Sequence, residues 1–172
     1  PDAHRFFRRI IEATPGDEAA WDDIADHIAR TYAEGDTQAL IGLDDAARDA
    51  REVDLLRAAG VEVLAVPLSE GPVFHNVESA GGRVQTCVAT GVPLPMMALP
   101  DAWNEARAWS FTPVAGEIHD EWSAAIPHGS FVVVGWQGFL RALAPGQRVG
   151  RIPPRRSALL DRADLVGVSH HD

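Results

Sequence analysis

The chain has 172 residues, of which 46% are hydrophobic and 23% charged, and this composition indicates one globular domain with its own core rather than a disordered chain. Its formal net charge of −10 at pH 7 repels phosphate backbones, so we do not expect a nucleic-acid partner. No apolar run approaches the roughly 20 residues of a membrane-spanning helix, and the first residues lack a signal-peptide pattern, so we expect no membrane association and a cytoplasmic protein.

The first segment, residues 1–37, is predicted to be helical. Thr14 followed by Pro15 is typical of a helix N-terminus, because the side chain caps the helix and proline suits its first turn. Apolar residues then recur at helical spacing, at Ala20, Trp21, Ile24, Ile28 and Tyr32. A shorter helix is expected over about residues 4–13. Residues 38–172 are predicted to form the second segment, an α/β domain.

A helix and a strand open this second segment. Asp44 or Asp45 is expected to cap the helix, and Gly60 is expected to end it. Residues 61–66 are rich in valine and apolar throughout apart from one glutamate, which predicts a buried strand. A helix, a glycine and then a strand form the second half of a crossover between parallel strands.

A β-hairpin is predicted next, with strands over residues 73–79 and 83–90. Gly81 and Gly82 lie between them and supply the backbone freedom that tight hairpin turns need. Cys87 is the single cysteine and falls in the second strand, so it cannot form an internal disulfide. We expect it to be a small buried apolar residue in a protein of a reducing compartment.

The last part of the chain alternates strands with helices. A proline-rich stretch over residues 93–100 is expected to be irregular and to lead to a short helix. The predicted helices are 101–107, 117–125 and 153–160, and the predicted strands are 109–114, 131–134 and 164–168. Such alternation is typical of a parallel sheet flanked by helices, so the predicted fold class is α/β.

Several common catalytic motifs are absent from the sequence. It contains no phosphate-binding loop of the G-x-x-x-x-G-K-[ST] type, no G-x-G-x-x-G, no H-E-x-x-H and no G-x-S-x-G. Two His-Asp pairs are present, His119-Asp120 and His171-Asp172, and imidazole with carboxylate can hold a metal ion that activates water. A metal-dependent hydrolase therefore stays open as an alternative, beside ordinary polar loop residues.

Six short blocks occur in a distinctive order along residues 40–172. They are AAGVEV (58–63), GPVFHN (71–76), GGR (81–83), TPVAGEI (112–118), VGWQGFLR (134–141) and ADLVGVS (163–169). This series resembles the ribokinase-like (phosphofructokinase-B type) carbohydrate kinases, particularly a bacterial subgroup with a Q-G-[FW]-L-R element. The resemblance implies a mostly parallel sheet flanked by helices, with a small β lid hairpin near the sugar site.

On this resemblance, residues 73–90 form the lid and Asn76 faces substrate, while an ordinary edge hairpin is the alternative. Gly116, Gln137 and Gly138 follow predicted strands, where open α/β sheets bind ligands, so they are predicted to line the pocket. The two glycines could instead serve only to permit tight turns.

The resemblance also implies ATP and Mg²⁺, with phosphoryl transfer from ATP to a sugar or nucleoside hydroxyl, and a homodimer formed through the lid. Asp172 would be the acidic member of the family's Asn-x-x-Glu motif, which organises Mg²⁺, although Ser169 stands in place of the asparagine. The family's early Gly-Gly sugar-binding segment and its G-A-G-D motif, which carries the general base, are not found. The chain starts at Pro1 rather than Met, and we expect it to be an incomplete view of such a kinase that does not phosphorylate a sugar by itself. The alternative is a degenerate, non-catalytic binding or regulatory module.

Overall fold

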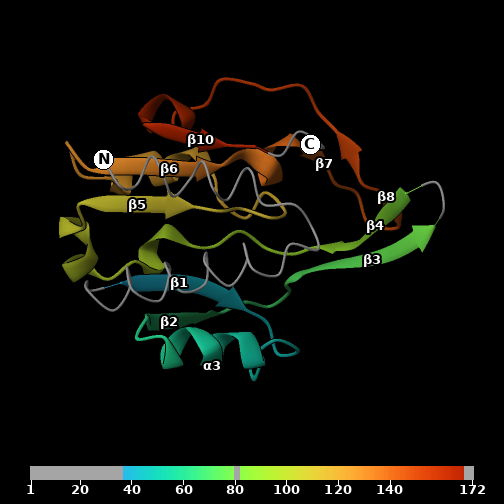
Figure 1. Ribbon diagram of the computed structural model, residues 1–172, viewed down its shortest axis with the longest axis horizontal. Helices are drawn as coiled ribbons and strands as arrows, with labels where there is room; N and C mark the ends of the chain where they lie inside the picture. Colours follow the sequence, from blue (N-terminus) through green and yellow to red (C-terminus); the bar gives the residue numbers. More distant parts are fainter. Residues whose placement is uncertain (1–36, 80–81, 169–172) are drawn as a thin grey trace, which may run out of the picture. The chain divides into compact units, whose positions relative to one another are not determined.

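The protein was analysed as a computed structural model, which describes residues 37–79 and 82–168 (Figure 1). The described residues fall into two compact units, one with residues 37–41 and 49–64, the other with residues 42–48 and 65–168. The helices predicted before residue 37 lie outside the described residues.

The first elements form a β-α-β arrangement, with β1 (Gln38–Leu43), α3 (Arg51–Ala58) and β2 (Glu62–Pro67). The backbone N–H of Glu62 donates to the carbonyl of Thr37 at 2.9 Å. Farther along both strands, the N–H of Leu68 donates to the carbonyl of Leu43 at 2.8 Å. Residue numbers rise together along β1 and β2, so the strands are parallel, and the predicted helix and strand are confirmed.

The predicted cap of α3 is wrong. Ala50 occupies the N-cap position with extended backbone and no side-chain hydrogen bond. The Asp44 carboxylate instead accepts hydrogen bonds from the backbone N–H of Ala47 and of Gly71, both at 2.9 Å. Asp44 thus orders the turn after β1 and joins it to the residue before the hairpin. These bonds, that of Gly71 foremost, lower the pKa of Asp44 below its ordinary value.

Replacing Asp44 by asparagine should therefore destabilise the protein in a pH-dependent way. A carboxyl whose folded pKa is lowered contributes stability above its unfolded pKa, and this contribution is lost as the pH falls through the folded pKa. We expect the urea midpoint of Asp44→Asn to lie below that of the wild type at pH 7, and the gap to close below about pH 4. The exposed Asp49 gives a matched control, Asp49→Asn. An equal gap at both pH values would contradict the prediction.

The predicted hairpin is confirmed, with β3 (Pro72–Ser79) antiparallel to β4 (Gly82–Thr90). The register pairs Phe74 with Cys87 and Asn76 with Gln85. On its other side β4 pairs with the short strand β8 (Gln147–Arg148), so the sheet order is β3-β4-β8. Cys87 is completely buried, as expected of a small apolar residue.

The second sheet is parallel and consists of β5 (Ala108–Phe111), β6 (Phe131–Gly135) and β10 (Leu165–Gly167), in the order β10-β6-β5. Val132 and Val134 of the central strand are fully buried. The Phe111 ring meets the ring of Trp122 edge-on, at 6.2 Å between centroids. Parallel strand pairs with few helices confirm the predicted α/β class.

The predicted late helices are mostly wrong. Residues 101–107 and 117–125 contain 3-10 helices in place of α-helices, and residues 153–160 are mainly irregular. Proline explains much of this, because it lacks the backbone N–H and its ring clashes within a helix. The 3-10 helices are η1 (Met96–Ala98), η2 (Asp101–Glu105), η3 (Asp120–Ala125), η4 (Trp136–Leu140) and η5 (Leu160–Arg162), and a small antiparallel pair joins β7 (Arg141–Ala142) to β9 (Gly150–Arg151).

Among the described residues, no helix combines the length and the apolar character needed to cross a bilayer.

Candidate ligand-binding edge of the parallel sheet

Two loops leave the parallel sheet at the carboxyl ends of its strands. Residues 112–117 follow β5, and η4 follows β6 directly. Because β5 and β6 are parallel, both loops lie at the same edge, where open α/β sheets bind ligands. In Figure 1 the arrowheads of β5 and β6 point to the right, toward the side on which the β3–β4 hairpin extends.

The loop after β5 is ordered by its own carboxylate. The two carboxylate oxygens of Glu117 accept hydrogen bonds from the backbone N–H of Val114 at 2.8 Å and of Ala115 at 2.7 Å. Between them Gly116 has a φ of 76°, which a residue with a Cβ rarely adopts. Gly116 therefore has a conformational role in the turn, whatever else it contacts.

The loop after β6 packs closely against the loop after β5. Gly138 is buried, and a Cβ at this position would lie 2.2 Å from the backbone oxygen of Pro113. Gln137 precedes it in η4 and is exposed. The structure thus places Gly138, and with it Gln137, at the edge where the loop with Gly116 begins, and gives Gly138 a steric reason for being glycine.

Arg141 links these loops to the hairpin. One guanidinium nitrogen, Nη1, donates to the carbonyl of Val114 at 3.0 Å. The central guanidinium carbon lies 5.6 Å from the centroid of the Phe74 ring in β3, within the range of a cation–π interaction. The fourth predicted position, Asn76, lies two residues after Phe74 and therefore on the same face of β3. Its side-chain oxygen accepts a hydrogen bond from Gln85 Nε2 at 2.9 Å.

The sequence did not single out Phe74, Arg141 or Glu117 as site residues. Arg141 is the last residue of the Q-G-F-L-R block, and Phe74 lies two residues before Asn76, so that both point to one face of a strand. The sequence therefore contained some indication that these two residues belong to the site. Nothing in the local sequence indicates that the Glu117 carboxylate turns back onto the loop that precedes it.

The described residues do not fit a metal centre. No group of three or more His, Cys, Asp or Glu within residues 37–79 and 82–168 could hold a metal ion. At the candidate edge, Glu117 already uses both oxygens on backbone N–H groups. His119 is exposed, and Asp120 accepts a bond from the N–H of Leu159 at 3.4 Å, which is a structural role. Asp172 lies outside the described residues.

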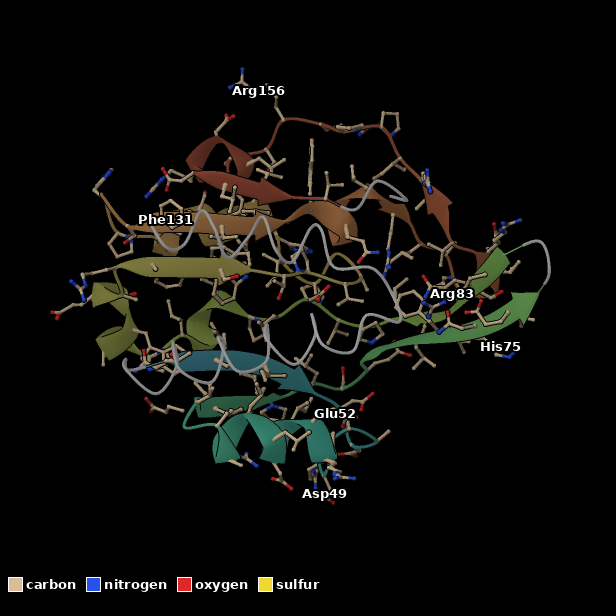
Figure 2. All side chains as sticks on the ribbon, in the orientation of Figure 1. Asp49, Glu52, His75, Arg83, Phe131 and Arg156 are labelled. Carbon is tan, nitrogen blue, oxygen red and sulfur yellow. The ribbon has the colours of Figure 1, made fainter. Side chains whose placement is uncertain are left out.

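A pocket of about 350 Å³ lies at the opposite, amino-terminal edge of the parallel sheet. In Figure 2, Phe131, which lines the pocket, lies at the left, whereas His75 of the hairpin lies at the right. Two of its polar side chains have structural partners: Asp164 accepts a bond from the N–H of Val132 at 2.8 Å, and Arg162 donates to two backbone carbonyls. We therefore interpret these side chains as stabilising the segments in which the strands begin, rather than as binding a ligand.

No protein-family model matches the chain, and the comparison with curated proteins found no match either. Solved structures are similar in fold. One is a pyrophosphate-dependent kinase in the ribokinase family, seen as a sulfate complex, and another is such a kinase complexed with a pyrophosphate analog and myo-inositol. Each has a TM-score of 0.52 and 16% sequence identity over 74% of this chain. The chain spans about 45% and 44% of the length of those two proteins. The described fold is therefore ribokinase-like, which confirms the fold implied by the sequence blocks.

Proposed function

We propose that this chain functions in phosphoryl transfer to a hydroxyl group of a small polyhydroxylated acceptor, as the carbohydrate kinases of the phosphofructokinase-B type do. The observation that carries the proposal is the ribokinase-like fold, which it shares with kinases of the ribokinase family. The placement of polar and cationic side chains where the hairpin meets the carboxyl edge supports it, because this is where such sheets bind ligands.

The acceptor is proposed to be a sugar, a nucleoside or a cyclic polyol, and one structural neighbour is a complex with myo-inositol. The amides of Asn76 and Gln85 each offer donors and acceptors, which suit hydroxyl groups that donate and accept in turn. Specificity among polyols depends on such individual hydrogen bonds. Gln137, Gly116 and Gly138 are proposed to complete the binding edge.

The donor is proposed to be ATP, with pyrophosphate as the donor to test beside it, because both structural neighbours are pyrophosphate-dependent. Phosphoryl transfer relies on positioning and on neutralising negative charge, and Arg141 supplies a cation at this edge. Asp172 remains the proposed acidic residue for Mg²⁺. We derive no step through the metal, because the described residues do not fit one.

The test is a screen of the chain with ATP or pyrophosphate as donor, against sugars, nucleosides and myo-inositol, by detection of the phosphorylated product. Isothermal titration calorimetry with the same donors and acceptors measures binding without turnover. Product formation with any donor and acceptor pair supports the proposal. Because the G-A-G-D motif that carries the general base is not found in the sequence, binding of both a donor and an acceptor without product also agrees with the proposal. Binding of an acceptor without any donor favours a non-catalytic binding module, and neither binding nor product contradicts the proposal.

Replacing Asn76 by alanine should weaken acceptor binding. A lost hydrogen bond to a neutral group costs about 0.5–1.5 kcal/mol, so we expect the acceptor Kd to rise roughly 2- to 12-fold. Asn104 gives a matched control, Asn104→Ala, because it is also an exposed asparagine and lies in η2, away from this edge in sequence. Equal affinities of the Asn76→Ala variant and the wild type would remove Asn76 from the binding site.

A further inference from the structure

The guanidinium group of Arg141 contacts two segments that are far apart in the sequence. On one side it donates to the carbonyl of Val114, in the loop that follows β5. On the other side it lies against the ring of Phe74, in the first strand of the hairpin. This side chain is therefore one link between the hairpin and the carboxyl edge of the parallel sheet, beside the backbone pairing of β4 with β8 and of β7 with β9.

The two hairpin strands are held in different ways. The second strand, β4, is bound by backbone hydrogen bonds: Gly146 N–H donates to Cys87, and Val149 N–H donates to Gln85, both at 2.8 Å. The first strand, β3, is an edge strand, and in the described part of the chain it pairs with β4 alone. The outer side of β3 therefore has no backbone ladder, and the Phe74–Arg141 contact is a side-chain contact that holds β3 in addition to its pairing with β4.

The chemistry of arginine suits this double contact. The planar guanidinium can lie against an aromatic ring while an N–H at its rim donates to a carbonyl. A lysine ammonium is a compact charge on a flexible chain and cannot reproduce this arrangement in full. Asn76, on the same face of β3 as Phe74, is thereby held in a defined position relative to Val114.

We propose that Arg141 is a positioning residue that fixes the Phe74–Asn76 face of the hairpin relative to the loop after β5. The inference deepens the proposed function, because the acceptor would bind between these two surfaces. Arg141 acts through Phe74 and Val114, and it controls how far the face that carries Asn76 lies from the strand ends. Without it, the hairpin moves apart from the edge more often.

The first experiment measures hydrogen exchange of the ligand-free chain, resolved to the β3 and β4 amides. In Arg141→Met, we expect these amides to exchange about 2- to 5-fold faster, the loss that corresponds to one exposed cation–π contact. Arg141→Lys should restore part of the protection. The exposed Arg155 gives the matched control Arg155→Met, which should exchange as the wild type does. The urea midpoint of Arg141→Met should stay close to that of the wild type, because the change is local.

A second variant tests whether the effect runs through the aromatic ring. Phe74→Leu keeps an apolar side chain but loses the aromatic face, and it should also increase exchange in the hairpin. Combined with Arg141→Met, it should add little, because both changes remove the same contact. Unchanged exchange in Arg141→Met, or single effects that multiply in the double variant, would overturn the proposal.

The acceptor readout separates this inference from the proposed function. If an acceptor binds, Arg141→Met should raise its Kd, and Arg141→Lys should recover part of the loss. If no acceptor binds to the wild type, the proposed function fails, but faster hairpin exchange in Arg141→Met still supports the positioning role. If an acceptor binds equally well to Arg141→Met and the wild type, the role of Arg141 at that site is overturned.

Discussion

Replacing Leu159 by alanine should lower the free energy of unfolding by about 2–5 kcal/mol, because the side chain is completely buried. The loss combines the transfer free energy of the removed carbon atoms with the cost of the cavity that they leave. Leu159 directly precedes η5, after a mainly irregular stretch that starts at residue 152, and its N–H donates to Asp120. The side chain is thus a main apolar anchor of a segment without regular structure. Urea denaturation followed by circular dichroism measures the change.

Leu55 in α3 provides the matched control, because it is the same residue type and is 58% exposed. Leu55→Ala should change the free energy of unfolding by less than about 1 kcal/mol, as is usual for surface positions. Equal losses in the two variants would contradict the burial of Leu159, and so would a loss at Leu159 no larger than this surface value.

Replacing Gly138 by alanine should destabilise the protein by about 1–3 kcal/mol, the usual cost of forcing an extra methyl group into a packed region. The new Cβ would meet the backbone oxygen of Pro113 at 2.2 Å and its carbonyl carbon at 2.5 Å. Backbone atoms cannot move aside as the end of a flexible side chain can, so η4 or the loop after β5 must shift. The same shift should weaken acceptor binding at this edge, which calorimetry would measure beside the urea midpoint.

Gly167 in β10 is the matched control for this substitution. A Cβ there would meet nothing within 4 Å, and its backbone does not have a positive φ. Gly167→Ala should therefore keep the stability of the wild type within about 0.5 kcal/mol. A Gly138→Ala protein as stable as Gly167→Ala would show that the two loops are not in close contact.

The strands β2 to β6 and β10 were predictable from the sequence, whereas β1, the two-residue strands β7 to β9 and the nature of the late helices were not predicted. Runs of aromatic and β-branched residues, such as Phe131 to Val134, indicate buried strands directly, and paired glycines indicate the hairpin turn. The helix predictions failed in segments bordered by proline, where a single tryptophan is buried and the helix has little apolar surface to pack. Trp103 and Trp122 are each the one buried residue of a 3-10 helix. A short apolar pattern could not distinguish one buried anchor from an α-helical face.

The position of the predicted site residues at one edge followed from the sequence, whereas their contacts were not predictable. Gly116, Gln137 and Gly138 follow strands, and parallel pairing is enough to bring the ends of those strands to one edge. The contact between Arg141 and Phe74 joins residues from different sheets, and no local pattern encodes such a pair. The same holds for the packing of Gly138 on Pro113, which depends on how two loops approach each other.

The antiparallel pairing of β3 with β4 also has a consequence for the order of folding. Its partners are close in the sequence, so the hairpin closes a short loop at little entropic cost and can form within microseconds. The β5–β6–β10 sheet joins strands from residues 108 to 167 and must close much longer loops. The hairpin is therefore expected to form first and the parallel sheet later. The contact between Arg141 and Phe74 joins the hairpin to the edge of the parallel sheet, so it can form only after both are in place. Its presence therefore marks the completely folded chain.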